Sequence, residues 1–146
     1  MLQQYYPTPQ NNEFMYTLNK DFSFSAAHRV PSKEAGKCAN VHGHNYTVNL
    51  TIAGNELDES GFLANFGTLK KIVSDRYDHT YMNEHPEFNT ETESYMFPTT
   101  EVVARQIYEI VSHFLKTHQS NNPECIQVIL RETETSYVVF NPKGGI

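Results

Sequence analysis

The feature that most constrains the fold is a run of alternating polar and apolar residues that starts at a His-Gly-His motif. Successive side chains of a β-strand point to opposite faces, so His42 and His44 share one face. That face continues with apolar side chains, namely Tyr46, Val48, Leu50 and Ile52. We therefore predict a strand over 41–53 that begins with two imidazoles, close enough together to bind one metal ion.

A second alternating run, over 14–28, ends at His28 and supplies a third imidazole. Its even positions are apolar and are interrupted by Lys20: Phe14, Tyr16, Leu18, Phe22, Phe24 and Ala26. If the two strands pair as a hairpin across 29–40, His28 comes close to the other two histidines. Three histidines without a fourth protein ligand describe a catalytic type of zinc site with an open position. The alternative is that the three are unrelated polar residues at strand ends.

The cysteines indicate the compartment and add a candidate to the site. Cys38 lies four residues before His42, so its thiol can share the same site. Cys125 has a different setting, and two such thiols suit a reducing compartment better than a disulfide. The sequence contains neither a long apolar segment nor a secretory signal pattern. We therefore expect a cytoplasmic protein that is not embedded in a membrane.

Length and charge narrow the class of protein further. A chain of 146 residues fits one domain. We place this domain over 14–146, after a flexible arm over 1–13 that is rich in Gln, Asn and Pro. The net charge of −6 argues against nucleic acid and anionic membranes as partners. It is compatible with an anionic small molecule, which needs only a local basic patch.

Two helices are predicted downstream of the hairpin. Asn65 is a good N-cap residue for the first, which ends at Asp78 and His79. The second starts at 99–101 and fades by His118. Both segments carry apolar residues at helical spacing, so each is expected to pack one stripe against the rest of the protein.

Two short strands complete the chain, over 126–132 and 136–141. The order ββααββ predicts an α+β fold, with an antiparallel sheet and two helices on one face. Glu132 continues the apolar face of the third strand, after Ile126, Val128 and Leu130. A carboxylate in this phase either ends the strand in solvent or needs a compensating partner. Such a partner could be a pair of parallel donors on the edge of a heterocycle.

The pair formed by Asp78 and His79 is ambiguous by itself. Beside a thiol and a zinc ion it is a candidate proton relay, because a carboxylate fixes the tautomer of a neighbouring imidazole. Without that setting it is an ordinary polar pair at the C-terminus of a helix.

Six motifs follow one another along the chain. They are F-S-A-A-H (24–28), C-x3-H-G-H-N-Y (38–46), G-x4-F-x2-L-K (61–70), D-H (78–79), P-T-T-E (98–101) and E-T (132–133). Together they resemble the 6-pyruvoyl-tetrahydropterin synthase / 6-carboxy-tetrahydropterin synthase family, in the family's order and over about 15–141. The resemblance implies the tunnelling fold, in which three ββααββ subunits close a twelve-stranded β-barrel. Two such trimers stack into a homohexamer.

The resemblance also implies roles for individual residues. Zinc is the expected cofactor, and the residues that match its ligands are His28, His42 and His44. Cys38 matches the catalytic base, and Asp78 with His79 matches the catalytic aspartate–histidine pair. The residues that match the pterin-binding pocket are Glu132, as the anchor of the ring, and Thr99, Thr100 and Thr133, as its lining.

The spacing before the histidines distinguishes two branches of the family. The pyruvoyl branch typically has five residues between the cysteine and His-Gly-His, and the carboxy branch has three. Three residues separate Cys38 from His42, which favours the carboxy branch and the route to queuosine. One departure is Asn65, where that branch often has Asp, although both residues cap helices well.

The expected substrate is a pterin triphosphate, 7,8-dihydroneopterin triphosphate. In the carboxy branch it is converted to 6-carboxytetrahydropterin, acetaldehyde and triphosphate. The pyruvoyl branch eliminates triphosphate from the same substrate. Two other classes of function remain open. A non-catalytic module would bind zinc or a pterin without turnover, and a hydrolytic zinc enzyme would need no thiol base, so it would survive replacement of Cys38.

Overall fold

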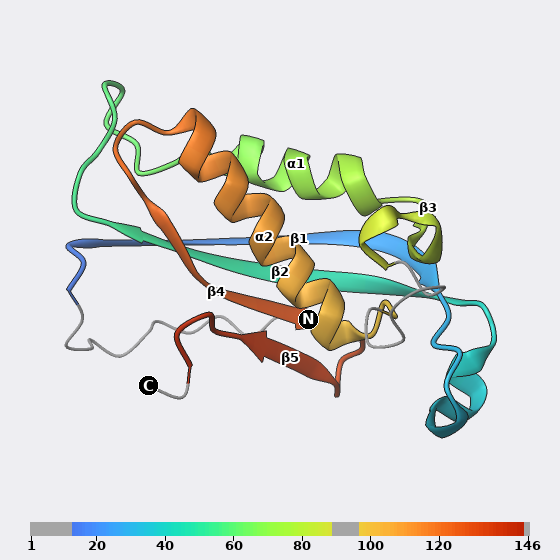
Figure 1. The fold of residues 1–146 in the computed structure, drawn as a ribbon. Coiled ribbons are helices and arrows are strands. Elements are labelled where there is room, and N and C mark those ends of the chain that lie inside the picture. Colours follow the sequence, from blue (N-terminus) through green and yellow to red (C-terminus); the bar gives the residue numbers. More distant parts are fainter. Residues whose placement is uncertain (1–12, 89–96, 145–146) are drawn as a thin grey trace.

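The computed structural model describes residues 13–88 and 97–144, and Figure 1 shows its ribbon. The arm predicted over 1–13 lies outside these ranges except for Glu13. Within them, no helix combines the length and the apolar character needed to cross a membrane.

The predicted hairpin is confirmed and organises the sheet. β1 (Tyr16–His28) pairs antiparallel with β2 (His42–Gly54) along its whole length. In this register His28 lies opposite His42, and Ala26 lies opposite His44. The two alternating runs are thus paired in phase, which brings the three histidines to the same end of the hairpin.

The connection between these strands is more regular than a loop. It contains the 3-10 helix η1 (Lys33–Ala39), which is interrupted at Gly36 with a φ of 57°. Glycine adopts this left-handed conformation without a steric penalty from a Cβ. Arg29 Nε donates a hydrogen bond to the carbonyl of Ala39 at 2.9 Å, so η1 is held against the end of β1.

Three further strands extend the sheet, in the order β3-β1-β2-β4-β5. β4 (Glu124–Arg131) and β5 (Tyr137–Phe140) continue it beyond β2, and both pairings are antiparallel. β3 (Thr80–Tyr81) runs parallel to β1. The sheet is therefore mixed, and the prediction of a purely antiparallel sheet is wrong at this edge. A strand of two residues has no alternation that a sequence pattern could reveal.

A bulge changes the phase of β4. The register of β2 against β4 shifts next to Ile52, which lies opposite Cys125. The shift leaves Ile126 without a partner across the ladder. Cys125 is buried and Ile126 only partly so. The predicted inward face is consequently correct at Val128 and Leu130 but wrong at Ile126.

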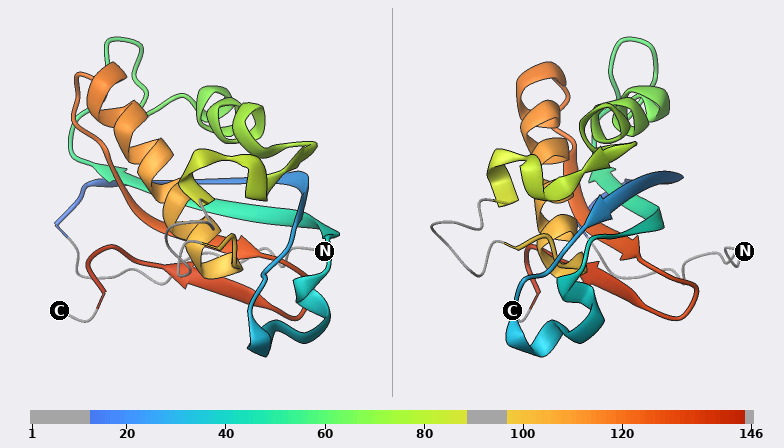
Figure 2. Two further views of the ribbon diagram at one scale, coloured as in Figure 1. Left: turned by 45° about the vertical axis from the view of Figure 1, so that its right-hand side comes forward. Right: turned by 90° about the vertical axis from the view of Figure 1, so that its right-hand side faces the viewer.

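Both predicted helices are present and cover the same face of the sheet (Figures 1 and 2). They are α1 (Phe66–Tyr77) and α2 (Thr100–His118). Asn65 and Thr99 cap them, and each side chain accepts a hydrogen bond from the backbone N–H three residues later. Most of the predicted apolar stripes are buried against the apolar face of the sheet, whereas Ile72, Ile110 and Phe114 are only partly buried.

Two 3-10 helices, η2 (Met82–Glu84) and η3 (Pro86–Phe88), follow β3. Glu87 of η3 accepts hydrogen bonds from Tyr77 Oη at 2.6 Å and from Arg76 Nε at 3.0 Å. Both donors belong to the last turn of α1. The segment that follows Asp78 and His79 is thereby fastened to the helix that precedes them.

The two faces of the sheet differ in character. The helix-covered face forms the core, with Phe24, Tyr46, Val48, Leu50, Leu130, Leu69, Val73, Val103, Ile107 and Val111 among its buried residues. The opposite face carries polar cross-strand pairs: Asn49 donates to Asp21 at 2.7 Å, and Thr51 donates to Asn19 at 2.9 Å. The single chain thus forms an open sheet rather than a closed barrel.

Candidate metal centre

The three histidines meet where β1 ends and β2 begins, as the sequence predicts. The ring centroids of His28 and His42 are 4.5 Å apart, and those of His28 and His44 are 5.1 Å apart. His42 and His44 are separated by 4.9 Å. His28 is buried and the other two are half-buried. The reading of these residues as unrelated polar strand ends is therefore wrong.

Backbone carbonyls determine the tautomer of two of the rings. His28 Nδ1 donates to the carbonyl of Pro98, and His42 Nδ1 donates to the carbonyl of Asn40, both at 2.7 Å. A carbonyl oxygen can only accept, so each Nδ1 carries the hydrogen. In the neutral ring the lone pair is then on Nε2. Burial lowers the pKa of His28 below its usual value, which favours this neutral form.

The free nitrogens point at a common position. The Nε2 atoms of His28 and His42 are 3.0 Å apart, and two facing lone pairs at this distance repel unless a cation lies between them. His44 Nε2 is buried and makes no hydrogen bond of acceptable geometry within the described part of the chain. Burial also lowers the pKa of His44. Three imidazoles with converging nitrogens are a suitable donor set for zinc.

The spacing of these nitrogens fits a single ion. Two nitrogens bound at about 2.0–2.1 Å to one tetrahedral zinc lie roughly 3.3 Å apart, close to the 3.0 Å between His28 and His42. The Nδ1–H groups of His28 and His42 donate to backbone carbonyls. Metal-binding histidines commonly donate the ring N–H that does not face the metal in this way. The residues therefore fit the metal that the resemblance implies.

Glu132 joins the histidines as a fourth donor. Its Oε1 lies 2.9 Å from Nε2 of His44 and 3.6 Å from Nε2 of His28. The donor atoms of the four residues all lie within 4.8 Å of one another. From the sequence, Glu132 is predicted to bind the pterin ring, and no fourth protein ligand is predicted beside the three histidines. The pairing of β2 with β4 could have indicated otherwise, because it aligns Leu130 with Val48 and carries Glu132 towards the histidines.

Cys38 lies on η1, four residues before His42. It is exposed on η1, and its carbonyl accepts a hydrogen bond from Val30 N at 2.8 Å. Its thiol does not belong to the cluster of four donors found among the described residues. The structure thus places Cys38 on the segment next to the metal centre, with its sulfur free of the ligand set.

Asp78 and His79 lie at the β3 edge of the sheet. Asp78 Oδ1 accepts a hydrogen bond from Ser25 N at 2.9 Å, and His79 N donates to Ser25 O at 2.6 Å. His79 has a φ of 60°, a conformation that is uncommon for residues other than glycine. Its imidazole is 85% exposed, and Nε2 lies 3.6 Å from Asp78 Oδ2. This distance is too long for a hydrogen bond.

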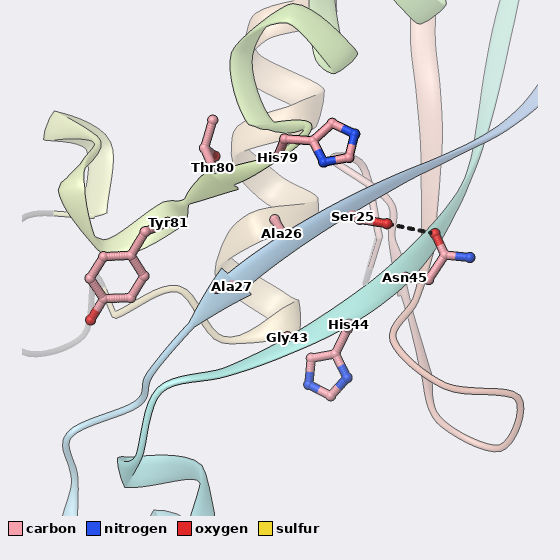
Figure 3. A pocket seen from close by; sticks show the side chains of 9 residues that line it. All are labelled: Ser25, Ala26, Ala27, Gly43, His44, Asn45, His79, Thr80 and Tyr81. Carbon is pink, nitrogen blue, oxygen red and sulfur yellow. Dashed lines mark hydrogen bonds between the residues drawn. The ribbon is translucent and has the colours of Figure 1, made fainter.

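An open hollow of about 560 Å³ lies over the end of β1, the start of β2 and the short strand β3. His79 and His44 both line it, together with Ser25 and Asn45, as Figure 3 shows. The two imidazoles lie on opposite sides of the β1–β2 pair (Figure 3). In the described ranges, no hydrogen bond or ion pair joins His79 to Cys38 or to the three histidines. Among the described residues of one chain, neither kind of interaction links the predicted relay to the predicted base.

The three threonines lie in two groups. Thr99 and Thr100 form the N-terminal end of α2, directly after the residue whose carbonyl binds His28. Thr133 follows Glu132 in the turn between β4 and β5, where its N–H donates to Ser136 O at 3.3 Å. Thr99 also caps the helix, so its hydroxyl has a structural role in addition to the predicted one.

Comparison with known proteins identifies the family. The chain matches the family described as 6-pyruvoyl tetrahydropterin synthase over residues 17–143. A protein of Bacillus subtilis (strain 168), named 6-carboxy-5,6,7,8-tetrahydropterin synthase, is 53% identical over 145 residues, which cover 99% of this chain and 97% of that protein. A protein of the same name from Synechocystis sp. is 33% identical, over 88% of this chain and 96% of that protein.

A solved structure agrees with these sequences. The structure of Caenorhabditis elegans 6-pyruvoyl tetrahydropterin synthase matches with a TM-score of 0.65 and 29% sequence identity. The match covers 86% of this chain and 94% of that chain. Family match, sequence identity and fold agree over nearly the whole length. The chain belongs to the 6-pyruvoyl tetrahydropterin synthase family.

Proposed function

We propose that the protein is a zinc-dependent 6-carboxy-5,6,7,8-tetrahydropterin synthase that acts on 7,8-dihydroneopterin triphosphate. The observation that carries this proposal is the convergence of three imidazoles and Glu132, with donor atoms within 4.8 Å of one another. The carboxy branch is supported by the spacing of three residues between Cys38 and His42. It is also supported by the name of the Bacillus subtilis relative at 53% identity.

The residues would divide the chemistry among them. Zinc held by His28, His42 and His44 would act as a Lewis acid on the hydroxyl groups of the substrate's side chain. Cys38 lies on η1 next to this centre, and as a thiolate it would accept a proton from the same side chain. A neighbouring cation lowers the pKa of a thiol, which favours the thiolate.

A second group of residues would recognise the pterin ring. Glu132 would accept two parallel hydrogen bonds, from a ring N–H and from the exocyclic amine of the pterin. Thr99, Thr100 and Thr133 would line the pocket on either side of it. The carboxylate of Glu132 would also select against heterocycles that carry acceptors on this edge, because a carboxylate has no hydrogen to donate to them.

The Asp78–His79 pair would act in an oligomer. We propose a homohexamer built from two trimers, with the pair of one chain completing the centre of another. In the described ranges β1 pairs with β3 only at Ala26 and Ala27, so most of one sheet edge is open. β5 forms the other edge. Open strand edges readily pair with further chains. A ring of chains would pair both edges of each sheet with neighbouring chains.

Product analysis tests the function. The zinc-loaded protein is incubated with 7,8-dihydroneopterin triphosphate, and the products are identified by mass. We expect 6-carboxytetrahydropterin with acetaldehyde and triphosphate. Formation of 6-pyruvoyl-tetrahydropterin instead would assign the other branch. Binding without any turnover would leave a pterin-binding module, and release of phosphate with an intact side chain would indicate a hydrolase.

A further inference from the structure

Glu132 contacts the candidate metal ligands, which binding of a pterin ring alone would not require. Its side chain is 25% exposed, and the ion-pair partners that it has among the described residues are the imidazoles of His28 and His44. A mostly buried carboxylate is costly without a compensating cation. A divalent ion held by the three histidines would provide that charge, with Glu132 Oε1 already on the same side as their free nitrogens.

We infer that Glu132 is the fourth ligand of the metal in the resting protein and is exchanged for the pterin ring when substrate binds. This inference rests on the proposed function, and it assigns one carboxylate two successive partners. In the resting protein His₃Glu coordination would close the metal site. When the ring arrives, both oxygens of Glu132 would turn to its N–H groups, and the metal's fourth position would open.

The position of Glu132 in the chain suits such an exchange. It is the first residue after β4, and its backbone N–H donates to Ser136 O at 3.0 Å, which fixes the main chain of the turn. A glutamate side chain can still rotate about its own bonds from a fixed Cα. A carboxylate that binds a heterocycle through both oxygens lies in the plane of that ring. The contact of Oε1 with the imidazoles is therefore lost as the ring is bound.

The exchange would link recognition to reactivity. A closed four-ligand site has no position for water or for a stray hydroxyl compound. Only a ligand with two adjacent N–H donors would release Glu132, so the site would open for pterins in preference to other polyols. Such coupling of ring binding to completion of the site is a form of induced fit.

The first arm of the test measures zinc affinity without any pterin. Competition with a chromophoric chelator is used to compare the parent, Glu132→Gln and the matched control Glu109→Gln, whose side chain is on the exposed face of α2. We expect affinity to fall by at least about 10–100-fold in Glu132→Gln, because losing a charged ligand should cost no less than losing an outer contact to a ligand, for which this is the usual scale. With excess zinc this variant should still bind one ion per chain through its histidines. Equal affinities in all three proteins would overturn the inference.

The second arm follows the exchange by cobalt spectroscopy. The probe is 7,8-dihydropterin without a side chain, which has no hydroxyl to offer the metal. Its binding to the cobalt-substituted parent is measured by calorimetry, and the visible spectrum should change as Glu132 leaves. A bound ring with an unchanged spectrum would overturn the exchange while the proposed function stands. Failure of the ring to bind would overturn the exchange and the proposed function together.

Discussion

The carboxylate of Glu87 should contribute to stability in a way that depends on pH. Burial by itself raises the pKa of this group, but hydrogen bonds from Arg76 and Tyr77 outweigh that effect and hold the pKa at about 2. The difference between this pKa and the usual value of 4.5 corresponds to roughly 3 kcal/mol in the free energy of unfolding. Arg76 is 42% exposed, so solvent screening reduces the contribution to roughly 2 kcal/mol.

The sign of the pH dependence follows from the direction of this shift. The folded pKa lies below the unfolded value, so the contribution is fully present above about pH 4.5. It is lost progressively as the pH falls through about 2. Glu87→Gln removes the charge at every pH. We therefore expect this variant to be about 2 kcal/mol less stable than the parent at pH 7, with the difference narrowing between pH 4.5 and pH 2.

Urea unfolding at fixed protein concentration measures this difference, since stability of an oligomer depends on concentration. Asp75→Asn is the matched control, because Asp75 pairs with Lys71 one turn earlier on α1 and both are well exposed. Its effect should stay below about 0.5 kcal/mol. If Glu87→Gln and Asp75→Asn lose the same stability at pH 7, or if the Glu87 difference does not change with pH, the argument for Glu87 is wrong.

Four further outcomes test the site and the assembly. His44→Ala should bind zinc much more weakly than the parent, because only two imidazoles remain beside Glu132; an unchanged zinc affinity would exclude His44 as a ligand. Cys38→Ala should retain zinc but lose turnover, and an active variant would point to a hydrolase. Glu132→Gln should weaken pterin binding by about 2–4 kcal/mol in calorimetry, and unchanged binding would remove it as the anchor. Light scattering should give six copies, and a monomer at micromolar concentration would contradict the assembly.

The parts of the fold that the sequence predicts are those with local signals. The alternating runs determine which faces of β1 and β2 are buried, and pairing in phase then brings His28 to His42 and His44. Asn65 and Thr99 mark helix starts because their side chains replace missing backbone partners. These patterns act over a few residues, so they can be read without knowing the tertiary structure.

The parts that the sequence does not predict depend on contacts between distant segments. β3 is too short to show a period, and it is defined by its pairing with Ala26 and Ala27 of β1, next to the hydrogen bond from His79 N to Ser25 O. The bulge that turns Cys125 inward depends on how β4 meets β2. Glu132 reaches the histidines for the same reason. In each case the deciding partner lies far away along the chain, where periodicity carries no information.

The proposed ligands differ in how firmly the structure holds them. The rings of His28 and His42 are fixed, whereas the carboxylate of Glu132 can change position. His28 and His42 are held by the carbonyls of Pro98 and Asn40 at 2.7 Å, so neither ring can turn without losing a hydrogen bond, and the bond of His28 is buried. Among the described residues, the carboxylate of Glu132 is paired with the imidazoles of His28 and His44, and it reaches them from a turn. A metal site that keeps its ion through repeated reactions needs ligands that stay in place, whereas a substrate-dependent opening needs one that can leave. The proposed centre would contain both kinds, and its exchangeable ligand, Glu132, is the one that would also recognise the ring.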